Sequence, residues 1–366
     1  MKITKPEWTP KNAGEEFATN VIPGIENLDS EKKTLIKKSH LVINDFVDGI
    51  KSGNRTILAK AITLIESNSP KHFITAQNIL QKLLPETGKS IRIGITGSPG
   101  AGKSTFIDSL GTFLCKLGKR VAVLAVDPSS SRSKGSILGD KTRMEELARH
   151  KNAFIRPSPS GGVLGGVARK TRESVLLCEA AGFDIILIET VGVGQSEIAV
   201  RSMVDFFLLL LLPGAGDDLQ GIKKGSVEIA DALVVNKADS GNEHRAESTR
   251  ISYEQAIHYI LPATEGWQTP VFSCSSIENM GIESIWNSVV QFSEYTKKSL
   301  LFYERRKQQQ LKWVHSMIAE EIKNMFYSHP NIIKNLQRIE TEVNDGDRTP
   351  TQAVHTLLDL FKRDME

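Results

Sequence analysis

The spacing of hydrophobic side chains changes twice along this 366-residue chain. From about residue 31 to residue 85, apolar positions recur every three or four residues, which predicts amphipathic helices. Ser69-Pro70 and Pro85 interrupt the pattern, so we expect two of these helices over 57–65 and 73–84. Residues 1 to about 30 are polar and are interrupted by Pro and Gly, which predicts an arm rather than packed structure.

From about residue 90 the pattern changes to short, almost continuously apolar runs that alternate with helical stretches. Such runs are typical of strands in a parallel sheet that is covered by helices on both faces. We therefore predict an α/β, doubly wound, mostly parallel core. The expected strands lie at 91–95, 121–126, 184–188, 206–212 and 232–235, and a further one begins at Val271.

The helical period returns after the core. One long helix is expected over 291–328, and two shorter helices follow Pro330, the last of them over 351–361. The chain is therefore predicted to have three parts. These are an N-terminal arm and helical extension (1–88), the α/β domain (89–290) and a C-terminal helical segment (291–366).

Charge and composition exclude several classes of function. The chain has 46 basic and 43 acidic residues, and this near balance predicts neither nucleic acid nor membrane as a partner. Its longest apolar run, 206–212, is far shorter than the roughly 20 residues that a membrane span needs. The N-terminus has no apolar signal region, and the three cysteines lack metal-ligand spacing. We expect a cytoplasmic protein whose cysteines act as small buried hydrophobic residues.

The strongest chemical motif follows the first predicted strand. The string GSPGAGKST fits the P-loop pattern G-x-x-x-x-G-K-[ST] and comes between a strand and a helix, as a P-loop requires. Its backbone N–H groups would surround phosphate oxygens, with Lys103 at the β- and γ-phosphates and Ser104 on Mg²⁺. A glycine-rich turn of a dinucleotide fold is the alternative, which Lys-Ser-Thr in register disfavours. The candidate residues are Gly97, Ser98, Pro99, Gly100, Ala101, Gly102, Lys103, Ser104 and Thr105.

A second motif, N-K-A-D, begins at Asn236 directly after a predicted strand. Asp239 would accept hydrogen bonds from guanine N1–H and the 2-amino group. Adenine offers neither donor there, so the motif predicts selection of GTP. Lys237 would lie along the base plane, and Asn236 would tie this loop to the P-loop. A capped turn is the alternative interpretation.

The segment Ser275, Ser276 and Ile277 follows the predicted strand that begins at Val271. It lies where GTPases hold guanine O6 with backbone N–H groups of an S-A-x loop. Ser276 replaces the alanine of that pattern, a change that leaves the backbone contact available. A polar turn between strand and helix is the alternative.

Four residues are candidates for the metal and the γ-phosphate. Glu189 ends a predicted strand and could hold Mg²⁺ directly or through water, and the N–H of Gly192 could reach the γ-phosphate. Asp127 and Asp140 are carboxylates that could reach the metal or the attacking water, because Mg²⁺ takes oxygen ligands. Each of the three acids could instead cap a helix or lie in a solvated turn.

The position that orients water in many GTPases differs here. No glutamine directly follows Gly192, and Gln195 is displaced from that position by two residues. We therefore expect slow intrinsic hydrolysis that a partner accelerates.

Several strings occur together in one order: GITGSPGAGKST, AVDPSS, GSILGDKTRM, ETVGVGQSE, PGAGDDLQGIKKG and VNKAD. In this order the chain resembles the MeaB/ArgK family, the methylmalonyl-CoA mutase-associated P-loop GTPases, from about residue 57 to residue 286. The resemblance implies a homodimeric G protein with a C-terminal dimerisation arm. It also implies a chaperone that gates cofactor loading and protects an adenosylcobalamin-dependent acyl-CoA mutase.

The same resemblance implies roles for individual residues. The GDDLQGIKKG string corresponds to a further switch that forms with the mutase, and the ligands implied are GTP or GDP and Mg²⁺. The residues that match functional positions of the family are Lys103 and Ser104 for phosphate and Mg²⁺, Asp127, Asp140 and Glu189 for the metal and switch regions, and Asp239 for guanine.

Two other functions remain as alternatives. One is a P-loop kinase or ATPase linked to amino-acid transport, which is an older label of this family, although a kinase has little need for the guanine-selecting motif. The other is a different metal-insertion GTPase, such as one that handles nickel. The eight histidines show no paired spacing of the kind that stores metal.

Overall fold

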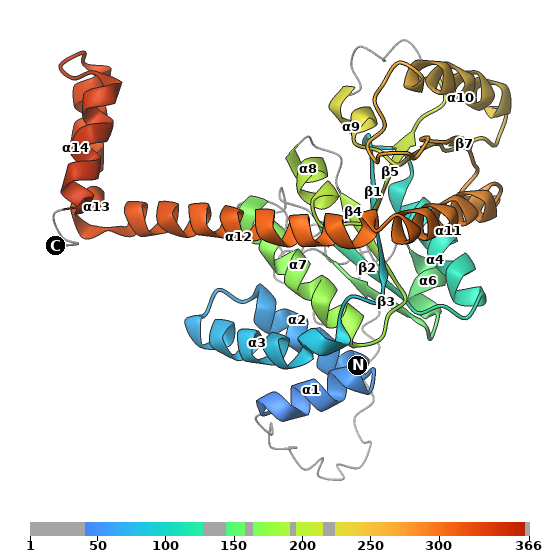
Figure 1. The fold of residues 1–366 in the computed structure, drawn as a ribbon, viewed down its shortest axis with the longest axis horizontal. Helices are drawn as coiled ribbons and strands as arrows, with labels where there is room; N and C mark the ends of the chain where they lie inside the picture. Colours follow the sequence, from blue (N-terminus) through green and yellow to red (C-terminus); the bar gives the residue numbers. More distant parts are fainter. Residues whose placement is uncertain (1–40, 127–143, 158–163, 191–194, 215–223, 363–366) are drawn as a thin grey trace, which may run out of the picture. The chain divides into compact units, whose positions relative to one another are not determined.

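The computed structural model describes residues 41–126, 144–157, 164–190, 195–214 and 224–362 (Figure 1). Its contacts divide the chain into two units, 1–42 and 43–366. All helices and strands described below belong to the second unit.

A seven-stranded sheet forms the centre of the described part of this unit, and all its strands are parallel. Their order across the sheet is β3-β2-β4-β1-β5-β6-β7. This confirms the predicted parallel core and adds one strand that the pattern did not predict, β3. The strands are β1 (Ile91–Gly97), β2 (Val121–Val126), β3 (Ala153–Arg156), β4 (Ile185–Thr190), β5 (Phe206–Leu211), β6 (Ala232–Val235) and β7 (Val271–Ser273).

The first strand lies at the middle of the sheet, where the strand order changes direction. β1 pairs with β4 on one side and β5 on the other, with Ile95 opposite Glu189 and Gly97 opposite Leu210. After β1 the chain crosses to β2, which lies beyond β4 on one side of β1. After β4 it crosses to β5, which lies on the other side of β1. In open α/β sheets, ligands bind outside the carboxyl ends of the strands at such a reversal. The P-loop follows β1 at this point.

Helices cover both faces of the sheet (Figure 1). On one face, α4 (Lys103–Lys116), α6 (Glu145–Arg149) and α11 (Ile282–Lys298) form an extensive apolar cluster with alternate residues of the central strands. On the other face, α7 (Leu164–Ala180) packs on β2 and β4, and α8 (Gln195–Arg201) packs on β1 and β4. Burial on both faces explains why the central strands are almost continuously apolar.

The predicted N-terminal helical extension is present. It consists of α1 (Ile43–Lys51), α2 (Arg55–Glu66) and α3 (Pro70–Leu83), which pack on one another, and α2 and α3 also pack on α7. Asn54 caps α2 by accepting hydrogen bonds from the backbone N–H groups of the first turn. Two short elements, η2 (Leu84–Glu86) and α9 (Lys224–Glu228), and the longer helix α10 (Glu243–Ile257) also belong to this unit.

The prediction of one continuous helix over 291–328 is wrong. The structure has α11 and a separate α12 (Leu301–Ser328), because Leu300 adopts a left-handed conformation with a φ of 63°. Such a conformation ends the regular helical hydrogen bonding and is unfavourable for a residue with a side chain. Tertiary contacts offset this cost, since Phe302 is buried and Arg306 forms an ion pair with Asp205.

The predicted helices after Pro330 are confirmed as α13 (Pro330–Asn344) and α14 (Pro350–Lys362), which share a small apolar cluster. Within the described ranges, no helix is long and apolar enough to cross a membrane. Cys115, Cys178 and Cys274 are buried and unpaired with one another, as expected for small hydrophobic residues. Burial raises the pKa of the Cys115 thiol to about 11.

Candidate nucleotide site

The P-loop connects the carboxyl end of β1 to the first residue of α4. That residue, Lys103, has a buried side chain, and its Nζ donates hydrogen bonds to the carbonyl oxygens of Gly97 (2.9 Å) and Ser98 (3.1 Å). The loop therefore bends around the ammonium group. Its positive charge lies at the start of a helix, where the backbone N–H groups already favour an anion.

Two glycines of the loop are required by close contacts. A Cβ atom on Gly97 would lie 2.5 Å from the backbone oxygen of Leu210 in β5. Gly102 has a φ of +85°, and its Cβ would lie 2.7 Å from Nδ2 of Asn236. Side chains at either position would push the loop away from β5 or from the N-K-A-D segment.

Ser104 and Glu189 meet at the base of the loop. Ser104 Oγ donates a hydrogen bond to Glu189 Oε1 at 3.0 Å, although the two residues are 85 positions apart. A hydroxyl and a carboxylate are oxygen ligands of the kind that Mg²⁺ takes, so this pair fits the metal that a bound nucleotide would bring.

Three of the predicted site residues cannot be placed. Asp127, Asp140 and Gly192 lie outside the described residues, so their roles remain predictions. Within the described ranges, no group of three or more His, Cys, Asp or Glu side chains could hold a metal ion. Ser104 and Glu189 are thus the two predicted metal ligands that lie within the described residues.

Asn236 joins three loops. Its Nδ2 donates to the carbonyl oxygen of Ala101 in the P-loop at 2.8 Å, which is the predicted tie between the two motifs. Its Oδ1 accepts hydrogen bonds from Ser276 N (3.2 Å) and Ser276 Oγ (2.7 Å). Because Asn236 is 1% exposed, these bonds are shielded from water and hold the three loops in one arrangement.

The two segments predicted to contact guanine also lie together. Ser275 Oγ donates to Asp239 Oδ2 at 2.5 Å, and the same hydroxyl accepts a bond from Glu278 N at 3.1 Å. Asp239 is buried, whereas Lys237 and Ile277 are exposed. Ser275 therefore orients the carboxylate of Asp239.

A further buried polar network borders the P-loop, and the sequence motifs did not identify it. Thr96 Oγ1 lies 2.8 Å from Thr190 Oγ1 and donates to Glu197 Oε1 at 3.4 Å, and Ser226 Oγ donates to Glu197 Oε2. Thr96 directly precedes Gly97, and Thr190 directly follows Glu189. Polar residues adjoining a P-loop and a metal-site carboxylate are a weak sequence signal, because hydroxyl residues are common at strand ends.

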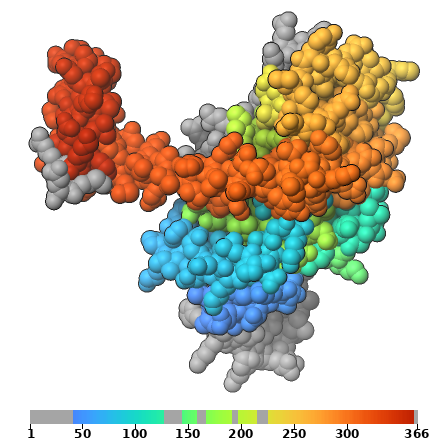
Figure 2. Space-filling view, viewed as in Figure 1, coloured from blue at the N-terminus to red at the C-terminus, as the bar shows by residue number. Residues whose placement is uncertain are grey.

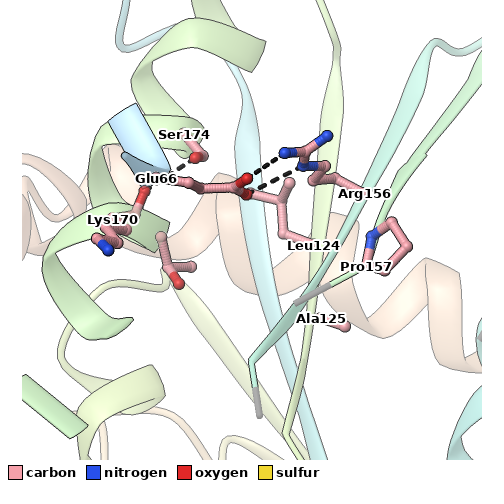
Figure 3. A pocket seen from close by; sticks show the side chains of 8 residues that line it. Glu66, Leu124, Ala125, Arg156, Pro157, Lys170 and Ser174 are labelled. Carbon is pink, nitrogen blue, oxygen red and sulfur yellow. Dashed lines mark hydrogen bonds and ion pairs between the residues drawn. The ribbon is translucent and has the colours of Figure 1, made fainter. Parts of the chain in front are cut away.

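The N-terminal helices reach the same edge of the sheet (Figure 3). Arg156, at the carboxyl end of β3, forms two hydrogen bonds with the carboxylate of Glu66 in α2, one of them from Nε at 3.0 Å. Nearby, Lys170 Nζ donates to Asn68 Oδ1 at 2.7 Å, and burial lowers the pKa of Lys170. The cavity between these groups measures about 10 Å³, which is enough for a single water molecule. We interpret this cluster as a clamp between α2, α7 and the sheet rather than as a ligand pocket.

Replacing Glu66 by Gln is expected to lower the free energy of unfolding by about 2 kcal/mol, because Arg156 then loses charge-assisted hydrogen bonds in a partly buried position. Urea denaturation measures the change. The matched control is Glu145→Gln, whose side chain is 67% exposed and pairs with Arg149 on the surface, where an effect of at most about 0.5 kcal/mol is expected. Equal destabilisation in the two variants would contradict the clamp.

Replacing Ser276 by Ala is expected to change the affinity for GDP by less than about threefold, because the backbone N–H of Ser276 still binds Asn236. Replacing Asn236 by Ala removes the bond to Ala101 as well and is expected to weaken GDP binding by about tenfold. Calorimetric titration of both variants tests this. Equal losses of affinity in the two variants would show that the bond from Asn236 to Ala101 adds nothing to GDP binding beyond the bond from the Ser276 hydroxyl.

Known proteins resemble this chain over most of its length. The sequence matches the family described as "Methylmalonyl Co-A mutase-associated GTPase MeaB" over residues 58–331. The GTPase ArgK of Escherichia coli is 42% identical over 86% of this chain and 95% of its own. The mitochondrial methylmalonic aciduria type A homolog of Mus musculus is 42% identical over 92% of this chain and 83% of its own.

A Caulobacter vibrioides protein described as a GTPase is 50% identical over 85% of this chain and 95% of its own. Among solved structures, a protein titled LAO/AO transport system kinase superposes with a TM-score of 0.72 at 36% identity, covering 87% of this chain and 97% of that one. The parallel sheet, the P-loop at its centre and these matches lead to one assignment. The chain belongs to the MeaB family of P-loop GTPases.

Proposed function

We propose that this GTPase is a chaperone of an adenosylcobalamin-dependent acyl-CoA mutase of the methylmalonyl-CoA mutase type. It would gate the loading of the cofactor and protect the mutase while it hydrolyses GTP. The observation that carries this proposal is the contact between Asn236 and the P-loop, in a chain whose family is described as mutase-associated. This contact brings a guanine-selecting motif and a phosphate-binding motif into one site.

Each predicted residue has a task in this site. Residues 97–105 bind the phosphates through backbone N–H groups, and Lys103 adds a positive charge that a triphosphate attracts more strongly than a diphosphate. Ser104 and Glu189 supply oxygen ligands to Mg²⁺, which neutralises phosphate charge when it is bound. Asp127, Asp140 and Gly192 complete the metal and γ-phosphate contacts in this proposal.

The base is read at the other end of the site. Asp239 accepts the guanine N1–H and 2-amino hydrogens, while the backbone of Ser275, Ser276 and Ile277 contacts guanine O6. Lys237 has an exposed side chain and covers the base plane in this proposal. Basal hydrolysis is slow in this proposal, since no glutamine follows Gly192, and the mutase accelerates it.

A homodimer is the expected assembly. The long helix α12 is orange in Figure 2. It leaves an apolar stripe open to solvent at helical spacing, which a second copy of the chain could cover. Its members are Leu311, Val314, Ile318, Ile322 and Met325, each at least 45% exposed. We also propose a cytoplasmic location, in keeping with three unpaired cysteines.

Affinity capture tests the proposed partner. The purified chain is immobilised and exposed to cobalamin-dependent acyl-CoA mutases, with GDP in one arm and a non-hydrolysable GTP analogue in the other. Binding that differs between the arms supports the proposal, and failure to capture any mutase in either arm contradicts it. The alternative is a P-loop kinase, and tighter binding of ATP than of GTP by the chain alone would support that function instead.

A further inference from the structure

The buried carboxylate of Glu197 connects three segments around the P-loop. It lies in α8 and is 5% exposed, with Oε1 accepting a bond from Thr96 and Oε2 accepting one from Ser226 in α9. Thr96 in turn is 2.8 Å from Thr190 at the end of β4. All four side chains are buried, so the network is shielded from water.

The residues of this network adjoin both the P-loop and the candidate metal ligand. Thr96 is the last residue of β1 before Gly97, and Thr190 follows the candidate metal ligand Glu189. Four residues separate the end of β4 from the start of α8, and α9 contains Ser226. One carboxylate therefore joins the strand that carries the P-loop, the end of β4 that carries Glu189, and two short helices.

Two kinds of contact hold α8 in place. Its C-terminal part is held by Val200, which is fully buried, and a Cβ on Gly94 of β1 would lie 2.9 Å from the Val200 side chain. Glu197 lies nearer to the N-terminus of α8, the end that follows β4. Hydrogen bonds to a carboxylate in a water-excluded site are more directional than van der Waals contacts, so they determine how this end is oriented.

We propose that Glu197 is a positioning residue for GTP hydrolysis. It keeps the start of α8 and the end of β4 at a fixed distance from the P-loop, so that Glu189 stays aligned with the phosphates. Helix α9 is held in the same arrangement through Ser226. The inference rests on the GTPase activity and does not require the mutase. Glu197 acts through Thr96, Thr190 and Ser226 and is not assigned a contact with the nucleotide.

The test is Glu197→Gln in the full-length chain, measured by basal GTP hydrolysis without any partner. This replacement keeps the shape of the side chain but removes its charge and one acceptor oxygen. We expect kcat to fall about tenfold, while KM for GTP and the Kd for GDP stay within about twofold, because the P-loop and the guanine contacts are unchanged. A purely structural role would lower stability without this separation of kcat from KM.

Two further variants make the test specific. Ser226→Ala is expected to lower kcat about threefold, and the loss in the double variant with Glu197→Gln should be smaller than the product of the two single losses, since the two side chains contact each other. The matched control is Glu173→Gln in α7, which is equally buried and accepts a bond from Gln77. It should lower the melting temperature and leave kcat unchanged.

Three results would overturn the inference. They are a wild-type kcat for folded Glu197→Gln, an equal loss of kcat in Glu173→Gln, and independent, multiplicative effects of Glu197→Gln and Ser226→Ala. If Glu197→Gln does not fold, two variants take its place: Ser226→Ala, which removes a hydroxyl group, and Thr190→Val, which replaces a hydroxyl group with a methyl group. The inference then requires a lower kcat with unchanged KM in both. Because no mutase is present, a failure of the chaperone proposal would appear in the capture experiment and not here.

Discussion

Replacing Lys103 by Ala should lower kcat/KM for GTP by roughly 10²- to 10³-fold, the usual loss when one group that stabilises transition-state charge is removed. Lys103 is buried at the start of α4, with its ammonium group held by the carbonyl oxygens of Gly97 and Ser98. The proposed phosphate contacts therefore come from a charge that the loop has already oriented. Alanine removes this charge. Water molecules in its place would stabilise the negative charge of the phosphates less well, because they are not held in a fixed orientation.

Phosphate release under steady-state conditions measures this loss, and calorimetry with GDP separates binding from catalysis. The matched control is Lys116→Ala, at the exposed C-terminal end of the same helix, which should keep full activity. A melting temperature near that of the wild type shows that the variant is folded. A Lys103→Ala protein with more than a tenth of the wild-type kcat/KM would remove the lysine from the proposed site.

The second large effect is a change of base preference. Replacing Asp239 by Asn is expected to weaken GTP binding by about 100-fold, because the amide group presents donors to the 2-amino group of guanine in place of an acceptor. Xanthine has a carbonyl oxygen where guanine has this amino group, so the same amide can donate to it. The variant should therefore bind XTP more tightly than GTP.

Competition against a fluorescent guanine nucleotide measures both affinities. Ser275 is expected to keep the new side chain in place, because a serine hydroxyl can donate to an amide oxygen or accept from an amide nitrogen. Asp359→Asn makes the same chemical change at an exposed position of α14 and should leave the preference for GTP unchanged. Equal losses of GTP and XTP affinity in Asp239→Asn would indicate a misfolded loop rather than a base-reading carboxylate.

Much of the site could be predicted because its chemistry is local in sequence. The P-loop needs Gly97, Gly102 and Lys103 at fixed short spacings, and one strand-to-helix turn brings them together. The N-K-A-D motif is similarly compact, and it identified Asn236 as the residue that would contact the P-loop. The 2.8 Å bond from Asn236 to Ala101 confirms that contact.

Other features could not be predicted from local patterns. The helix break at Leu300 has no Gly or Pro to mark it and depends on contacts of Phe302 and Arg306 with the rest of the fold. Strand β3 was missed because AFIR is short and only partly buried, and its pairing with β2 determines its structure. In both cases long-range packing overrides a weak local preference.

The sequence by itself determined the class of fold, the phosphate-binding loop and the preference expected for guanine. Alternation of apolar runs with helical periods specifies a covered parallel sheet, and each motif carries its chemistry within a few residues. Only the tertiary structure decided which distant groups meet: Ser104 with Glu189, Arg156 with Glu66, and Glu197 with Thr96 and Ser226. These partners are between 29 and 101 positions apart. The order of strands in the sheet explains the first of these pairs, because β1 lies beside β4 and the carboxyl ends of the two strands meet at one edge. The other pairs depend on how the helices pack against the sheet.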